Sequence, residues 1–101
     1  MAELDRIRID KWLWQARFFK TRGLAVEVVT KGHLRINGDK IKKPGRAVGP
    51  GDMLTFRQGQ VVRVVRILSC GDRRGPASEA QHLYTDLTPD NDVPPADNIV
   101  E

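Results

Sequence analysis

The dipeptide Asn37-Gly38 restricts the fold of this 101-residue chain more than any other sequence feature. Both residue types accept a positive φ, and Asn-Gly is a favoured two-residue connection of a β-hairpin because its twist matches that of the flanking strands. The segments on either side, Leu34–Ile36 and Asp39–Ile41, supply the apolar residues that half-buried strands need. We therefore predict a tight hairpin over residues 34–41.

Two longer strands are expected after this hairpin. Residues 53–57 and 61–68 are rich in β-branched and other apolar side chains and flank the turn sequence Gln58-Gly59-Gln60. Four short strands therefore form the predicted sheet. Further along the chain, residues 71–75 are expected to form a basic loop and residues 78–85 a short terminal helix.

The segment before the hairpin has helical spacing. Asp10 is the predicted N-cap of a first helix that runs to about Phe19, because its apolar residues recur along one stripe. Thr21 is the predicted N-cap of a second helix that ends at about Lys31, where Gly32 supplies the stop. Two short helices should therefore precede the sheet.

Charge is segregated along the chain. Residues 1–74 hold all 17 Lys and Arg with 7 acidic residues, a net charge of +10, whereas residues 75–101 hold 6 acidic residues and no base. A basic body favours a polyanionic partner such as nucleic acid, with binding that weakens as salt rises. The acidic end, residues 88–101, is rich in Pro and Asp, and we expect it to be disordered. A second interpretation is that this tail folds over the basic surface and competes with phosphate.

Several classes of function find no support. Cys70 is the single cysteine, so an internal disulfide or a cysteine metal cluster is excluded, and His33 and His82 have no ligand partners at metal-site spacing. The sequence has no phosphate-cradling glycine motif and no nucleophile elbow. It also has no signal peptide or long apolar run. We expect a cytoplasmic, non-enzymatic protein without a cofactor, a metal or a membrane partner.

Four ordered segments carry a family resemblance, and they are residues 8–14, 20–25, 32–38 and Gly51-Asp52. In order and spacing they resemble the small RNA-binding domain named after ribosomal small-subunit protein four. Trp12 and Trp14, with residues 18–22 and 73–76, make the chain similar to the bacterial heat-shock protein fifteen family over residues 6–87. One tryptophan should be buried. The other could stack on a base, although a partly buried packing role is favoured.

The resemblance implies an α+β fold of the alpha-L type. Two short helices would pack on a small, mostly antiparallel sheet, followed by a short C-terminal helix and a disordered tail. The chain then divides into an RNA-binding domain (6–70), a basic loop with a short helix (71–87) and an acidic tail (88–101). A monomer suits such a small, highly charged body.

The resemblance also implies where RNA lies, on the helix pair and the adjacent hairpin. The first group of expected RNA-binding residues is Arg8, Lys11, Lys20, Thr21 and Arg22. Residues that could extend this surface are Arg17, Arg35, Lys40, Lys42, Lys43 and Arg46. Guanidinium forks and lysine ammonium groups are the usual phosphate ligands, whereas Asp10 is expected to be structural because its charge opposes RNA.

The implied function is non-catalytic binding of structured ribosomal RNA. Family likeness points to the large ribosomal subunit and its peptidyl transfer RNA, in rescue or recycling of stalled subunits that carry a nascent chain. A closely similar role is that of a quality-control factor that steadies peptidyl transfer RNA during tail addition. The sequence also fits a general structured-RNA or tRNA-binding accessory module, a relative of an RNA-modifying enzyme that lacks the catalytic domain, and, on charge alone, a DNA-binding module.

Overall fold

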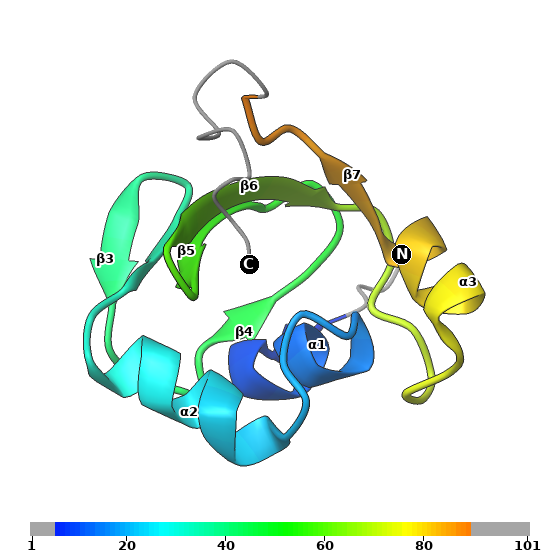
Figure 1. Ribbon diagram of the computed structural model, residues 1–101, viewed down its shortest axis with the longest axis horizontal. Coiled ribbons are helices and arrows are strands. Elements are labelled where there is room, and N and C mark those ends of the chain that lie inside the picture. Colours follow the sequence, from blue (N-terminus) through cyan, green and yellow to red (C-terminus); the bar gives the residue numbers. More distant parts are fainter. Residues whose placement is uncertain (1–5, 90–101) are drawn as a thin grey trace.

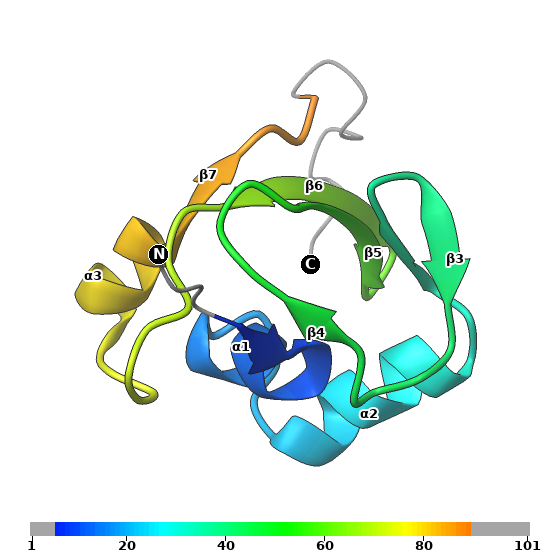
Figure 2. The same cartoon turned by 180° about the vertical axis from the view of Figure 1, so that it is seen from behind.

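The computed structural model describes residues 6–89 and shows two helices packed against one face of a curved sheet (Figure 1). The sheet has five strands in the order β3-β2-β5-β6-β7, and every neighbouring pair is antiparallel. The view from behind shows the same two layers, with α1 and α2 together on one side of the arch formed by β5 and β6 (Figure 2). The expected α+β architecture is confirmed.

Helix α1 (Ile9–Gln15) is shorter than predicted and begins two residues earlier. Arg8 occupies the N-cap position, so the prediction that Asp10 caps this helix is wrong; Asp10 lies in the first turn and accepts the Lys11 N–H at 2.8 Å. The helix does not continue to Phe19, because Arg17 adopts a φ of 67°. The Phe18 N–H then donates to the Leu13 carbonyl, and the Arg17 N–H donates to the Trp14 carbonyl, which closes the helix.

Helix α2 (Arg22–Thr30) matches its prediction closely. The Thr21 hydroxyl accepts the Leu24 N–H at 3.1 Å, so Thr21 is the N-cap, and Lys31 is the C-cap. Gly32 follows with a φ of 79°, as a helix stop requires. These local contacts orient the chain into the first strand of the hairpin.

The predicted hairpin is present as β2 (Leu34–Ile36) and β3 (Asp39–Ile41), joined by Asn37 and Gly38, which both have positive φ. Asn37 does more than turn the chain. Its side-chain oxygen accepts the Met53 N–H at 2.9 Å, and its amide donates to Asp52 at 3.0 Å. The hairpin turn is thereby fastened to the start of the next long strand.

The two long strands are also confirmed, as β5 (Met53–Gln58) and β6 (Val61–Ile67). The predicted number of four strands was too low, however. Two short strands outside the main sheet, β1 (Ile7–Arg8) and β4 (Ala47–Val48), pair with each other, and β7 (Tyr84–Asp86) adds an edge strand next to β6. Strands of two or three residues are too short to show the alternation of apolar and polar residues, so the sequence pattern does not reveal them.

The predicted terminal helix over residues 78–85 is partly wrong. Helix α3 (Ala77–Ala80) and a 3-10 turn (Gln81–Leu83) end before Tyr84, where β7 begins. Tyr84 packs on the core, 4.7 Å from Phe18 between ring centroids, and this contact favours the extended strand. The predicted disorder of residues 88–101 falls largely outside the described residues, although Thr88 is described and donates its hydroxyl to the Val64 carbonyl at 3.4 Å.

The core lies between α1, α2 and the inner face of the sheet. Trp12 is fully buried and donates its indole N–H to the Ser69 carbonyl at 2.9 Å, which ties α1 to the segment after β6. Trp14 is half-buried, with the Arg74 guanidinium 5.6 Å from its ring centroid. The expectation that one tryptophan is buried is therefore confirmed, and the partly buried Trp14 packs against Arg74.

Candidate nucleic-acid interface

Asp10 holds two arginines at the start of the helix pair. The carboxylate is 2% exposed and accepts Arg8 Nε at 3.1 Å on one oxygen and an Arg8 terminal nitrogen at 3.2 Å on the other. Arg22, the first residue of α2, reaches the same carboxylate at 3.5 Å. The side chains of Arg8 and Arg22 remain 56% and 41% exposed. We call Arg8, Asp10 and Arg22 the arginine clamp.

The Asp10 carboxylate stays ionised at neutral pH because its pKa is lowered. Burial alone raises the pKa of Asp10, but the hydrogen bond from Arg8, the positive charges of Arg22 and Arg8 and the Lys11 N–H outweigh burial and hold that pKa below its ordinary value of 3.8. One buried negative charge thus faces two outward positive charges. The exposed side of the clamp therefore favours an anion.

A turn formed by residues 43–46 lies against the clamp. The Asp10 N–H donates to the Pro44 carbonyl at 3.3 Å, and the Arg8 guanidinium carbon is 3.6 Å from the position of a Cβ on Gly45. Lys43 and Arg46, which flank this turn, are both exposed. The structure thus brings Arg8, Arg22 and the 43–46 turn together from three separate segments, which extends the basic surface beyond the clamp.

Lys20 and Thr21 lie next to the clamp in sequence but have different roles. The Thr21 hydroxyl is occupied as the cap of α2. Lys20 is exposed and lines a groove between α2 and the β5–β6 turn. Thr21 directly precedes Arg22 and Lys20 directly precedes Thr21, so the start of α2 connects the groove to the clamp.

Arg35 and Lys40 occupy the hairpin. They are opposite each other in the register of β2 and β3, and both are exposed, whereas the alternating residues Leu34 and Ile36 are buried. The Lys40 and Lys42 side chains also pass over Gly32, with Lys42 Cε 3.2 Å from the position of a Cβ there. Lys40 and Lys42 therefore border the C-terminal end of α2, whereas Arg35 donates to the Gly38 carbonyl at the hairpin turn, and none of the three is part of the clamp.

Lys11 and Arg17 face the segment that follows β6. Arg17 donates its Nε to the Gly75 carbonyl at 2.7 Å, and Lys11 lines a hollow together with Ser69 and Gly71. The arginine is therefore partly committed to holding the 71–75 loop. The expected RNA-binding residues do not form one continuous patch in the structure, and their role stays a prediction.

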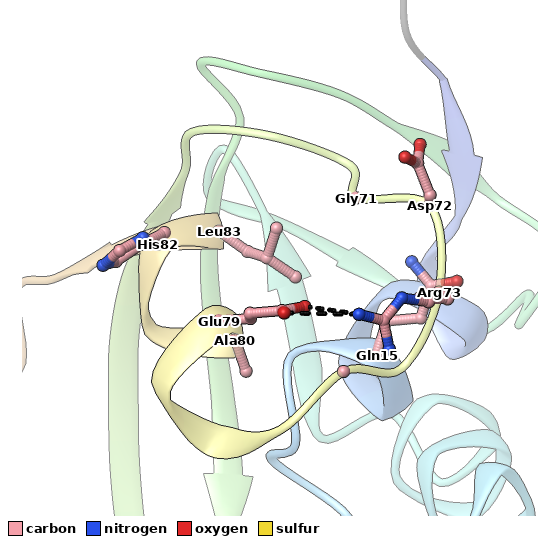
Figure 3. A pocket seen from close by; sticks show the side chains of 9 residues that line it. Gln15, Gly71, Asp72, Arg73, Glu79, Ala80, His82 and Leu83 are labelled. Atoms are coloured by element: carbon pink, nitrogen blue, oxygen red, sulfur yellow. Dashed lines mark hydrogen bonds and ion pairs between the residues drawn. The ribbon is translucent and has the colours of Figure 1, made fainter.

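Several cations were missed as candidates. Arg66 on β6 points away from the core because its neighbours Val65 and Ile67 are buried, and the alternation of this strand could have identified it. Arg73 and Arg74 stand on the loop after β6. Figure 3 shows Arg73 paired with Glu79 of α3 across a hollow of about 310 Å³, with a shortest nitrogen–oxygen distance of 3.1 Å.

Within residues 6–89, no group of three or more His, Cys, Asp or Glu side chains is arranged to hold a metal ion. In the same residues, no helix is long and apolar enough to cross a membrane.

The chain is similar to known proteins in both sequence and structure. A family model described as S4 domain matches residues 7–54, which cover the helix pair, the hairpin and the turn against the clamp. The structure of Vibrio cholerae Heat Shock Protein 15, described as trimeric, has a TM-score of 0.76 and 43% identity, and the match covers 81% of this chain and 82% of that chain.

Curated proteins are similar to this chain in sequence as well. Heat shock protein 15 of Escherichia coli (strain K12) is 46% identical over 78 residues, or 77% of this chain and 58% of that protein. The RQC P-site tRNA stabilizing factor of Bacillus subtilis (strain 168) is 40% identical over 81 residues, or 80% of this chain and 92% of that protein. The fold and the matched region define an S4-domain protein. Within that class, the chain belongs to the heat shock protein 15 family.

Length separates this chain from some relatives. The match spans 59% of the Heat shock protein 15 homolog of Aeromonas salmonicida, at 46% identity over 79 residues. In contrast, the match spans nearly the whole Bacillus factor, at 92% of its length. The similarity therefore covers most of this chain but only part of the longer relatives.

Proposed function

We propose that this protein binds structured RNA on the large ribosomal subunit, without catalysis, during rescue of stalled subunits that carry a nascent chain on transfer RNA. The single observation that carries the proposal is the arginine clamp. Two exposed arginine side chains are held on one buried carboxylate at the start of the helix pair. Guanidinium forks match phosphate oxygens in a bidentate geometry, and clamping them reduces the entropy lost on binding.

The charge around the clamp supports a polyanion over a small anion. The nearby cations Lys20, Lys43 and Arg46 are all exposed, and they come from different segments of the chain. A surface several residues wide fits successive phosphates of an RNA backbone better than one isolated group. Backbone contacts of this kind fix the position of the protein on folded RNA without reading its sequence.

The names of the relatives support the ribosomal part of the proposal. The Bacillus factor is named for stabilising P-site tRNA, and another relative, 35% identical over 71 residues, is a small ribosomal subunit protein, uS4, of Anaeromyxobacter sp. (strain K). None of these relatives is called an enzyme. We infer that peptidyl transfer RNA and large-subunit RNA are the partners of this chain, in the cytoplasm.

The test is sedimentation of tagged protein from bacterial lysate through a sucrose gradient. The variant Arg8→Gln/Arg22→Gln removes the two positive charges that Asp10 binds, and circular dichroism checks that it still folds. Arg66→Gln/Arg73→Gln is the control, because it removes the same charge from exposed sites outside the proposed surface. We expect wild type and control to migrate with large subunits and the clamp variant to stay at the top.

Two outcomes would contradict parts of this proposal. Wild-type protein that never enters the large-subunit fractions would contradict the ribosomal proposal and favour a general structured-RNA module. Equal loss of co-sedimentation in both variants would show that overall positive charge, and not the arginine clamp, holds the protein on the large subunit. The sedimentation of free protein also tests the expected monomer, since the Vibrio relative is described as a trimer.

A further inference from the structure

A groove of about 560 Å³ lies beside the clamp, between α2 and the β5–β6 turn. Its residues come from three segments that meet only in the folded chain: residues 18–20, the outer side of α2 and the turn around Gly59. The volume falls within the roughly 300–1,000 Å³ of small-molecule sites. It suits one flat ring system, whereas stable protein docking buries about 800 Å² on each partner.

The floor of the groove is apolar and contains an aromatic ring. Leu24 is 44% exposed there, beside the half-buried Phe19 and Val28. Phe19 rests on Phe56 of β5, with 5.9 Å between ring centroids, so its ring is supported from the core side. The buried face of α2 is formed by other residues, Ala25 and Val29. Leu24 is therefore not needed for the core.

The rim of the groove is basic. Lys20, Lys31 and Arg57 line it, together with His33. Among the described residues that line the groove, one is acidic, Glu27, which is 4.0 Å from Lys31. An apolar floor with an aromatic ring inside a cationic rim matches an unstacked nucleotide, whose base is flat and whose flanking phosphates are negative.

We propose that this groove takes the base of one unpaired nucleotide in the bound RNA, while Lys20, Lys31 and Arg57 contact the flanking phosphates. The inference rests on the proposed RNA-binding function and specifies which RNA feature is recognised. Lys20 lies on the groove rim and Arg22 in the clamp, with Thr21 between them, so one backbone can pass from the groove to the clamp. The protein thereby prefers RNA stems with an extruded base.

The probe is an RNA hairpin with a single unpaired uridine in its stem, compared with the same hairpin carrying an abasic ribose at that position. The two RNAs have the same number of phosphates and differ only in the base. For wild-type protein at physiological salt we expect about tenfold tighter binding of the hairpin that has the base. Fluorescence anisotropy measures both affinities.

Two variants locate the effect. Leu24→Ser should abolish the preference for the base and leave the affinity for the abasic RNA unchanged, because it removes an apolar side chain from the groove floor and changes no charge. Val62→Ser is the control, since Val62 is 52% exposed on β6 and does not line the groove. It should keep the tenfold preference. Circular dichroism confirms that both variants fold.

Failure of the inference is distinguishable from failure of the proposed function. Equal, tight binding of both RNAs by wild type would overturn the base-binding groove while leaving RNA binding intact. The same holds if Leu24→Ser keeps the preference; an acidic peptide would then be the better candidate for the groove. If wild type binds neither RNA, both the proposed RNA-binding function and the proposed base-binding groove are contradicted.

Discussion

Asp10 connects the fold to the proposed interface at the scale of a single residue. Its carboxylate is buried at the start of α1, yet it accepts hydrogen bonds from Arg8, Arg22 and the Lys11 N–H. A buried carboxylate with such partners remains charged and orients them. The acidic residue whose own charge opposes RNA therefore positions the two arginines that suit RNA best.

Replacing Asp10 with Asn should destabilise the protein at neutral pH by about 1–2 kcal/mol, because charge-assisted hydrogen bonds become neutral ones. The pKa of Asp10 is lower in the folded state than its ordinary value of 3.8, so its contribution is complete above that value and is lost as pH falls through the folded pKa. The stability gap between wild type and Asp10→Asn should narrow below pH 3.8.

Urea unfolding of both proteins at pH 7 and in the acid range measures this gap. Asp86, whose pKa is also lowered, titrates in both proteins and cancels in the difference. A gap of the same size at both pH values would show that Asp10 acts through its shape and not through its charge.

At the scale of elements, the start of α2 combines a structural cap with a proposed binding surface. The Thr21 hydroxyl is committed to the Leu24 N–H, so its first role is to begin the helix. Arg22 and Lys20 on either side face the clamp and the groove. Substitutions at Thr21 can therefore separate helix stability from RNA affinity.

Thr21→Ala should lower the free energy of unfolding by about 1 kcal/mol, since it removes the cap. Thr21→Asp should keep the stability, because Asp is an equally good cap and its charge favours a helix N-terminus. Its negative charge next to Lys20 and Arg22 should nevertheless weaken RNA binding severalfold. Thermal melts and anisotropy on the same samples check both expectations, and unchanged RNA binding by Thr21→Asp would place the RNA away from α2.

At the scale of the whole molecule, the basic residues spread over several surfaces. The clamp lies at the start of the helix pair, Arg66 points outward from β6, and the 71–75 loop holds Arg73 against Glu79. Net charge attracts RNA to every one of these surfaces. The salt dependence of binding then tells how many of the charges meet phosphate.

Each phosphate contact contributes a slope of about 0.7–0.9 to the decrease of log affinity with log salt. Arg8→Gln/Arg22→Gln should therefore reduce that slope by roughly 1.4–1.8 relative to wild type. Arg66→Gln/Arg73→Gln should leave the slope nearly unchanged. Anisotropy titrations between roughly 50 and 300 mM salt measure the slopes, and a similar decrease in both variants would argue for diffuse attraction without a defined interface.

Features set by neighbours in sequence were predictable. Asn37 and Gly38 define the hairpin, and Thr21 and Gly32 bound α2, because turns and caps use hydrogen bonds that close within a few residues. The family likeness also identified Arg8 and Arg22 as candidates. Their expected contact with RNA stays a prediction.

The tertiary structure decided what depends on residues far apart in the chain. The early end of α1 brings Phe18 onto the core, and β7 forms because β6 offers it an edge and Tyr84 packs against Phe18. The clamp joins residues twelve apart, Asp10 and Arg22, and the groove joins α2 to the β5–β6 turn. Short stretches of sequence determine local hydrogen bonds and the periodicity of apolar side chains. Burial and ion pairing, in contrast, depend on which distant segments meet in the folded chain.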